Sequence, residues 1–191
     1  QSFGTDGAID LKADDTQKIE PDLTTGEIGW QSAPTVAGDV VLVGSAFREG
    51  FTPTSFKNNK GSARGFDART GKKLWEFQTV PKAGQKFNDT WGDGWDGRSG
   101  TNMWAFSAPI DEANGLVFLP ISSPSPNYWG GSRPGTNLFG NSIVAVDPKT
   151  GEYRWHYQTL HHDLWDSDMT SARPLLDVTI NGKKQPILAH V

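Results

Sequence analysis

The chain has 191 residues and a formal net charge of −4, with 18 basic against 22 acidic residues. This balance excludes the strongly basic surface of a nucleic-acid-binding protein and a polybasic membrane patch. No cysteine is present, which excludes disulfides, thiolate zinc sites and a cysteine nucleophile within these residues. The longest apolar runs, 40–43 and 116–121, have the length of strands and fall short of the ~18 residues of a membrane span.

Both ends of the sequence predict an internal piece of a longer protein. The chain begins at Gln1 and shows no basic segment followed by an apolar leader. It stops at Val191, directly after the apolar run 186–189.

Short hairpin signals recur along the chain. The motif S-A-P, or S-A-R-P in its third copy, precedes an apolar run at 32–34, 107–109 and 171–174. Each run contains or follows a glycine that is suited to a tight turn. We interpret each of these stretches as two antiparallel strands.

A second repeat follows each of the first two hairpins. The pattern D-x-x-T-G-x-x-x-W-x-[FY]-Q-T occurs at 67–79 and 147–159, and a partial copy lies at 22–30. An apolar stretch precedes each full copy, so the pattern predicts strand, turn and strand. In the turn, Asp and Thr side chains bond the backbone, and Gly supplies a positive φ.

Two hairpins make one four-stranded unit. The units span about 32–106 and 107–170, and a truncated third unit covers 171–191, all within one domain over 1–191. Four-stranded units that repeat radially are β-propeller blades. The sequence therefore predicts an all-β fold, a partial propeller of about two to three blades.

Tryptophan is frequent for a chain of mean hydropathy −0.53. Because tryptophan is usually mostly buried, such a number predicts a repeated structural role, a ligand surface, or both. We expect Trp75 and Trp155, which belong to the repeat, to lock neighbouring blades together. The eight tryptophans are Trp30, Trp75, Trp91, Trp95, Trp104, Trp129, Trp155 and Trp165.

Three oxygen-bearing side chains lie just beyond predicted strands. They are Glu49, Ser125 and Asp166, each in a connection that could open on one face of the propeller. Such oxygen ligands suit a hard cation, although each residue alone is also typical of a solvated loop or a turn cap. The adjacent His161 and His162 are expected on an extended strand, with one of them in the core, and therefore not on a shared metal ion.

The long connections 47–62, 80–103 and 122–141 are the regions where we expect function. Trp104 follows a glycine-rich loop and lies outside the repeat, so it is a candidate platform for a flat ligand. Packing and substrate contact both remain open for Trp91, Trp95 and Trp129, which also lie in loops.

The motifs together resemble the quinoprotein dehydrogenases, which use pyrroloquinoline quinone (PQQ) and are eight-bladed propellers. The D-x-x-T-G-x-x-x-W repeat resembles the tryptophan-docking motif of that family. More specific are Y-W-G-G-S-R-P at 128–134 and the stretch 155–166, which ends in H-H-D-L-W-D. The resemblance runs from about Ile28 to Val191 and favours the membrane-bound glucose dehydrogenase type and its soluble relatives.

The resemblance implies roles for individual residues. Asp166 matches the catalytic base and a metal ligand, and Trp104 matches the tryptophan that stacks on the PQQ plane. Glu49 matches an acidic metal ligand, and Trp165 lies beside the base as a cofactor contact. Ser125 falls where the family has Asn or Thr as a metal ligand, so serine is a departure from the pattern.

The implied activity is the PQQ- and Ca²⁺-dependent (or Mg²⁺-dependent) oxidation of an alcohol or of an aldose sugar hydroxyl. Asp166 would take the hydroxyl proton, while a hydride passes to a quinone carbon that the metal polarises. Ubiquinone or cytochrome c would accept the electrons, and the periplasm is the expected compartment. We expect the isolated fragment to be inactive, because its sheet edges are open.

Two other readings compete with this one. A non-catalytic scaffold with PQQ-like blades would need the docking motif but not Glu49, Trp104 and Asp166 together. A sugar-binding or sugar-cleaving propeller would stack loop tryptophans on sugar faces and use Glu49 with Asp166 as a carboxylate pair roughly 5–10 Å apart. The specificity of H-H-D-L-W-D favours the dehydrogenase.

Overall fold

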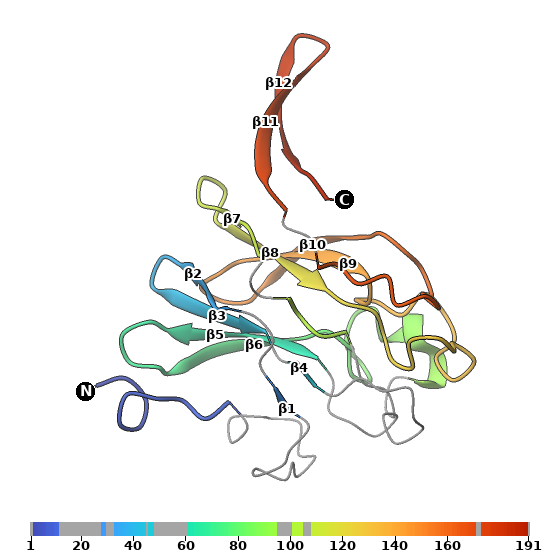
Figure 1. Cartoon of the computed structure of the whole chain (residues 1–191), viewed down its shortest axis with the longest axis horizontal. Coiled ribbons are helices and arrows are strands. Elements are labelled where there is room, and N and C mark those ends of the chain that lie inside the picture. The colour runs from blue at the N-terminus through green and yellow to red at the C-terminus, as the bar shows by residue number, and fades with distance from the viewer. Residues whose placement is uncertain are drawn as a thin grey trace.

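In the structure, a computed structural model, the regular elements are antiparallel strands apart from one short 3-10 helix, η2 (Asn88–Gly94), and long connections join them (Figure 1). It describes residues 2–11, 28–29, 33–44, 46–47, 61–94, 101–104, 108–170 and 173–190. The strands are β1 (Ile28–Gly29), β2 (Thr35–Ala37), β3 (Val40–Gly44), β4 (Ala46–Phe47), β5 (Ser62–Asp67), β6 (Lys73–Gln78), β7 (Ile110–Asp111), β8 (Leu116–Ile121), β9 (Ser142–Val146), β10 (Tyr153–Gln158), β11 (Leu175–Ile180) and β12 (Lys183–Leu188). Among these described residues no helix has the length and apolar character needed to cross a membrane.

The strands form two four-stranded sheets and a hairpin. The first sheet has the order β2-β3-β5-β6, and the second has the order β7-β8-β9-β10. The short β4 lies outside the first sheet and pairs with β1. The hairpin β11–β12 extends away from both sheets at the C-terminal end (Figure 1). The predicted all-β fold of four-stranded units is confirmed, and the third unit is present as its first hairpin.

Local turn chemistry explains the repeat. At the β5–β6 turn, Oδ1 of Asp67 accepts hydrogen bonds from the backbone N–H and the hydroxyl of Thr70, both at 2.7 Å. At the β9–β10 turn, Oδ1 of Asp147 accepts a bond from the backbone N–H of Thr150 at 3.1 Å. The hydrogen bonds from Thr70 hold the pKa of Asp67 below its ordinary value. These short-range bonds define each turn without help from the rest of the fold.

Trp75 joins the two sheets, as the repeat predicts. Its indole N–H donates to the carbonyl of Pro148 at 2.9 Å, so the tryptophan of the first blade docks on the turn of the second. The ring also lies on Gly151, where an added Cβ would come within 2.6 Å of it. Trp155 instead packs on Phe118 at 5.6 Å between ring centroids and is 41% exposed. Its docking on a further blade stays a prediction.

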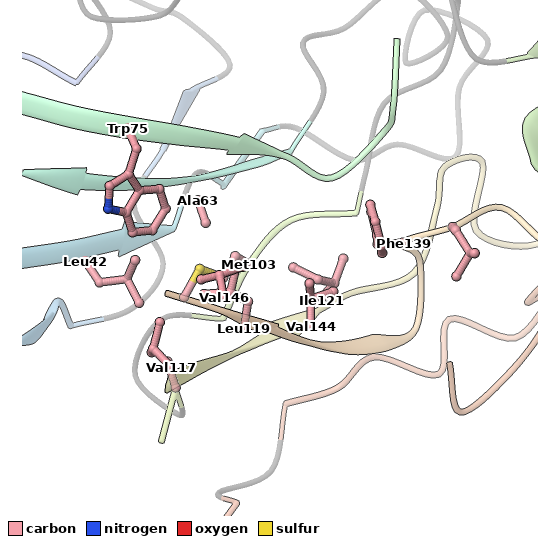
Figure 2. Packing of buried hydrophobic residues seen from close by; sticks show 12 residues of the cluster. Leu42, Ala63, Trp75, Met103, Val117, Leu119, Ile121, Phe139, Val144 and Val146 are labelled. Carbon is pink, nitrogen blue, oxygen red and sulfur yellow. The ribbon is translucent and has the colours of Figure 1, made fainter. Parts of the chain in front are cut away.

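The central strands of the second sheet, β8 and β9, are buried on both of their faces. Successive side chains of a strand point to opposite faces, so the core residues divide into two sets. The set between the two sheets includes Leu42, Ala63, Trp75, Met103, Val117, Leu119, Ile121, Val144 and Val146 (Figure 2). The set on the other face includes Phe118, Ile143, Ala145 and Met169, with Leu188 of the terminal hairpin packed against it. Burial on both faces is the environment of a propeller blade between two neighbours.

Alanine substitution at two glycines tests the docking of Trp75. Gly151 and Gly115 both have a positive φ, 70° and 63°, so alanine carries a similar backbone cost at each. An added Cβ meets the indole at Gly151 and has nothing within 4 Å at Gly115. We expect Gly151→Ala to lower the free energy of unfolding by about 1–3 kcal/mol more than Gly115→Ala. Urea denaturation of the full-length protein measures this difference, and equal losses would contradict the docking role.

Candidate functional site

The candidate site lies where three connections leave one end of the second sheet. The end of β8 at Ile121 pairs with Ser142 at the start of β9, and Ser142 pairs with Gln158 at the end of β10. The segments that follow β8, precede β9 and follow β10 therefore begin side by side. This geometry follows from antiparallel pairing alone.

Trp104 is attached to the same end of the sheet. The segment 101–104 runs beside the end of β8, where the N–H of Trp104 donates to the carbonyl of Pro120 at 3.1 Å. The N–H of Thr101 donates to the carbonyl of Ser123 at 2.9 Å. Met103 is buried in the core, whereas Trp104 is half-buried. The structure therefore places the half-buried Trp104 beside the end of β8, from which the connection with Ser125 leaves.

Asp163 is the most highly bonded carboxylate of the site. Its side chain is 2% exposed, and Oδ2 accepts bonds from the hydroxyl of Ser123 (2.7 Å), the amide of Asn141 (3.0 Å) and the N–H of Ser167 (2.7 Å). Oδ1 accepts from the N–H of Trp165 at 2.9 Å. Burial raises the pKa of Asp163, but these hydrogen bonds outweigh burial and leave the pKa below the ordinary value of 3.8. The residue is thus a charged, fully bonded anchor.

Arg133 ties the two long connections together. The guanidinium is completely buried and donates to the carbonyls of Pro126 (3.0 Å) and Asp163. It also donates to Oδ1 of Asn137 at 2.8 Å. Arg133 belongs to the Y-W-G-G-S-R-P stretch, and Asp163 belongs to H-H-D-L-W-D. Neither Arg133 nor Asp163 had been assigned a role from the sequence, although the two motifs that contain them carry the family resemblance.

Asn127, which the sequence did not indicate as a site residue, forms hydrogen bonds with both Asp166 and Ser125. Asn127 donates from its amide nitrogen to Oδ1 of Asp166. The hydroxyl of Ser125 donates to Oδ1 of Asn127 at 3.3 Å. Ser125 and Asn127 are both buried, at 1% and 6% exposure. In the sequence Asn127 is an ordinary loop amide, so only its position next to the Y-W-G-G-S-R-P stretch could have drawn attention to it.

A third carboxylate adds negative charge. Oδ1 of Asp168 accepts a hydrogen bond from the N–H of Ser123 at 2.8 Å. Burial is the main cause that raises the pKa of Asp168, and the negative charges of Asp166 and Asp163 raise it further. Carboxylates that are crowded in this way favour a nearby cation.

The side-chain oxygen atoms of Asp166 and Ser125 are of the type that binds a hard cation. Asp166 supplies carboxylate oxygen and Ser125 supplies hydroxyl oxygen, and both are ligands that Ca²⁺ and Mg²⁺ accept. Within the described ranges no group of three or more His, Cys, Asp or Glu side chains has metal-binding geometry. Glu49, the other predicted ligand, lies outside the described residues. The predicted metal site is therefore compatible with the residues present, and it stays a prediction.

The loop tryptophans differ in exposure. Trp91 is completely buried and its indole N–H donates to the carbonyl of Leu138, which favours the packing role. Trp129 is 56% exposed and Trp165 is 79% exposed, so both rings are accessible to a ligand. Trp95 lies outside the described residues. The cofactor contact of Trp165 stays a prediction.

The two histidines are not on a strand. β10 ends at Gln158, and the chain then bends, with His162 at a φ of +50°. His161 is exposed, and Nδ1 of the partly exposed His162 bonds the carbonyl of Gly135 at 2.8 Å. The expected extended strand with one histidine in the core was wrong, because the loop bonds of Asp163 turn the backbone here.

Comparison with known proteins gives consistent matches. The sequence profile described as "PQQ: Glucose/ethanol/alcohol dehydrogenase, beta-propeller domain" matches residues 1–191. The quinoprotein glucose dehydrogenase of Escherichia coli (strain K12) is 31% identical over 196 aligned positions, which cover 98% of this chain and 22% of that protein. The quinoprotein glucose dehydrogenase of Gluconobacter oxydans (strain 621H) is 33% identical over 179 positions, 93% of this chain and 21% of that protein.

A solved structure agrees with these matches. The quinohemoprotein alcohol dehydrogenase from Comamonas testosteroni superposes with a TM-score of 0.74 at 29% identity, covering 86% of this chain and 26% of that chain. The chain spans about a fifth of the length of the two glucose dehydrogenases. With the four-stranded units, the two-sided burial and the H-H-D-L-W-D loop, these matches show that the chain belongs to the PQQ-dependent glucose/ethanol/alcohol dehydrogenase family, as part of its β-propeller domain.

Proposed function

We propose that the protein containing this chain is a PQQ-dependent dehydrogenase that oxidises the hydroxyl of an alcohol or an aldose sugar. The observation that carries the proposal is Asp166, held by Asn127 at the end of the second sheet where Ser125 and Trp104 also lie. The relatives named for glucose and alcohol oxidation support this substrate class. A non-catalytic scaffold has no use for a polar network that brings three carboxylates, Asp163, Asp166 and Asp168, to one end of the sheet.

Different residues of the chain contribute to different parts of this oxidation. Asp166 accepts the proton of the substrate hydroxyl, which makes the carbon a better hydride donor. Asp163 and Arg133 hold the two connections together, so that the carboxylate of Asp166 keeps its place when substrate arrives. The exposed rings of Trp129 and Trp165 are positioned on the same connections and exclude water from a bound substrate.

PQQ, when bound, supplies the two-electron acceptor. Trp104 would offer its ring face to the cofactor, and Ser125, Asp166 and Glu49 would hold Ca²⁺ or Mg²⁺. Ubiquinone or cytochrome c would receive the electrons, and the haem named for the Comamonas enzyme supports a cytochrome route. The resemblance to the membrane-bound glucose dehydrogenase type supports a periplasmic location.

The first test concerns the base. We expect Asp166→Asn in the full-length protein to lower PQQ-dependent dye reduction by about 10²–10⁴-fold, because an amide does not accept the hydroxyl proton. Binding of PQQ, followed by quenching of tryptophan fluorescence, should persist. Asp111→Asn is the control, since Asp111 ends β7 at the β7–β8 turn and its side chain accepts hydrogen bonds from the nearby Asn114. Full activity of Asp166→Asn would exclude the base assignment.

The second test concerns the cofactors. Full-length protein is stripped of metal with a chelator and then supplied with PQQ, with Ca²⁺ or Mg²⁺, or with both, while glucose and simple alcohols are screened with a dye acceptor. We expect turnover only when PQQ and a divalent cation are both present. If no substrate gives PQQ-dependent dye reduction, the scaffold reading replaces the dehydrogenase.

The third test concerns the anchor. Asp163 has a folded-state pKa below 3.8, so its contribution to stability is present above that pH and is lost as the pH falls through the folded-state pKa. We therefore expect Asp163→Asn to destabilise the protein most near neutral pH and progressively less below pH 3.8. Urea unfolding of both proteins at several pH values measures this difference. A loss that is independent of pH would show that the charge of Asp163 is not what anchors the loops.

A further inference from the structure

We infer that Asn127 is a positioning residue for the base, and that it determines which oxygen of Asp166 receives the substrate proton. The inference rests on the proposed role of Asp166. It comes from the hydrogen bond between the Asn127 amide and Oδ1 of Asp166, which the structure shows and the sequence motifs do not reveal.

The orientation of the Asn127 amide follows from its two partners. An ionised carboxylate has no proton to donate, so the NH₂ group of Asn127 must face Asp166. The amide oxygen then faces Ser125, whose hydroxyl donates to it at 3.3 Å. A flipped amide would set two oxygens against each other beside Asp166. The bonds therefore run in one direction, from Ser125 through Asn127 to Asp166.

This bond leaves the two oxygens of Asp166 unequal. Oδ1 is engaged by Asn127, whereas among the residues that the structure describes no hydrogen bond to Oδ2 occurs. The backbone on either side is already fixed, because the N–H groups of Trp165 and Ser167 both donate to Asp163. Rotation of the Asp166 side chain is the freedom that remains, and Asn127 restricts it. Oδ2 is the oxygen left to accept the proton.

The contacts of Asn127 separate it from the structural amides nearby. Asn127 bonds only to the side chains of Ser125 and Asp166 among the described residues. Asn141, in contrast, donates to Asp163 and to backbone of the same loop, and Asn137 donates to the backbone of the loop that contains Arg133. Loss of the Asn127 amide should therefore disturb the base more than the fold.

The test uses the full-length holoenzyme with a substrate identified by the screen above. Asn127→Ala is compared with Asn114→Ala, a matched control in which an amide nitrogen also donates to a carboxylate, Asp111, at 2.7 Å but in an exposed turn. We expect Asn127→Ala to lower kcat by about 10²-fold, the loss typical of a misplaced reacting group. KM and the Kd for PQQ, read from tryptophan fluorescence, should change by less than about threefold, as a positioning role requires. Asn114→Ala should retain wild-type kcat.

Two further measurements separate positioning from other roles. With substrate deuterated at the reacting carbon, the isotope effect on kcat should rise in Asn127→Ala, because a displaced base makes the chemical step limiting. Asn127→Gln keeps the amide on a longer arm and should recover part of the lost kcat. If Asn127→Ala does not fold, kcat, KM and the Kd for PQQ are measured instead in Asn127→Gln and Asn127→Ser, which both retain a polar group.

Each outcome decides the question. An unchanged kcat in Asn127→Ala, with an active wild type, overturns the positioning role and leaves the proposed function intact. A weaker Kd for PQQ or a higher requirement for divalent cation, in proportion to the loss of kcat, also overturns it, because Asn127 would then act as a ligand. A wild type without PQQ-dependent turnover overturns the proposed function itself.

Discussion

The carboxylate of Asp163 joins three segments of the chain that leave the same end of the second sheet. It accepts bonds from Ser123 after β8, from Asn141 before β9, and from the N–H groups of Trp165 and Ser167 after β10. Without it the buried hydroxyl of Ser123 would lose its acceptor, and an unpaired buried donor is costly. The backbone on both sides of Asp166, the proposed base, is held by this single anion.

The blades supply the frame on which this anchor acts. Antiparallel pairing brings the three connections together, and Trp75 fixes the first sheet against the turn of the second. Burial on both faces of the central strands β8 and β9 then leaves these strands little room to shift. Function is thereby confined to the connections, which carry polar residues on a rigid scaffold.

The site contains one buried guanidinium, that of Arg133, and several carboxylates. Arg133 donates to two backbone carbonyls and to the amide oxygen of Asn137. Crowded carboxylates with a raised pKa at Asp168 favour a cation between them and the solvent. The electrostatics of the loops therefore agree with the predicted metal site.

Sequence alone determined the features that depend on short-range chemistry. The turns follow from Asp67 and Thr70, which bond within four residues of each other, and the family follows from H-H-D-L-W-D, whose letters are contiguous. From these the all-β fold, the four-stranded units and the docking of Trp75 could be predicted. The bend at His161 and His162 could not, because the bonds of this loop run to distant segments, between His162 and Gly135 and from Ser123 to Asp163.

Tertiary structure alone decided which polar residues support the base. Asn127 reaches Asp166 across 39 positions of sequence, and Asp163 reaches Ser123 across 40. Trp91 likewise became a core residue through a bond to Leu138, 47 positions away. No local pattern encodes such contacts, because their geometry is set by strand pairing and by packing of the sheets. The proposed base could therefore be chosen from the sequence, whereas the residues that hold it in place became visible only in the fold.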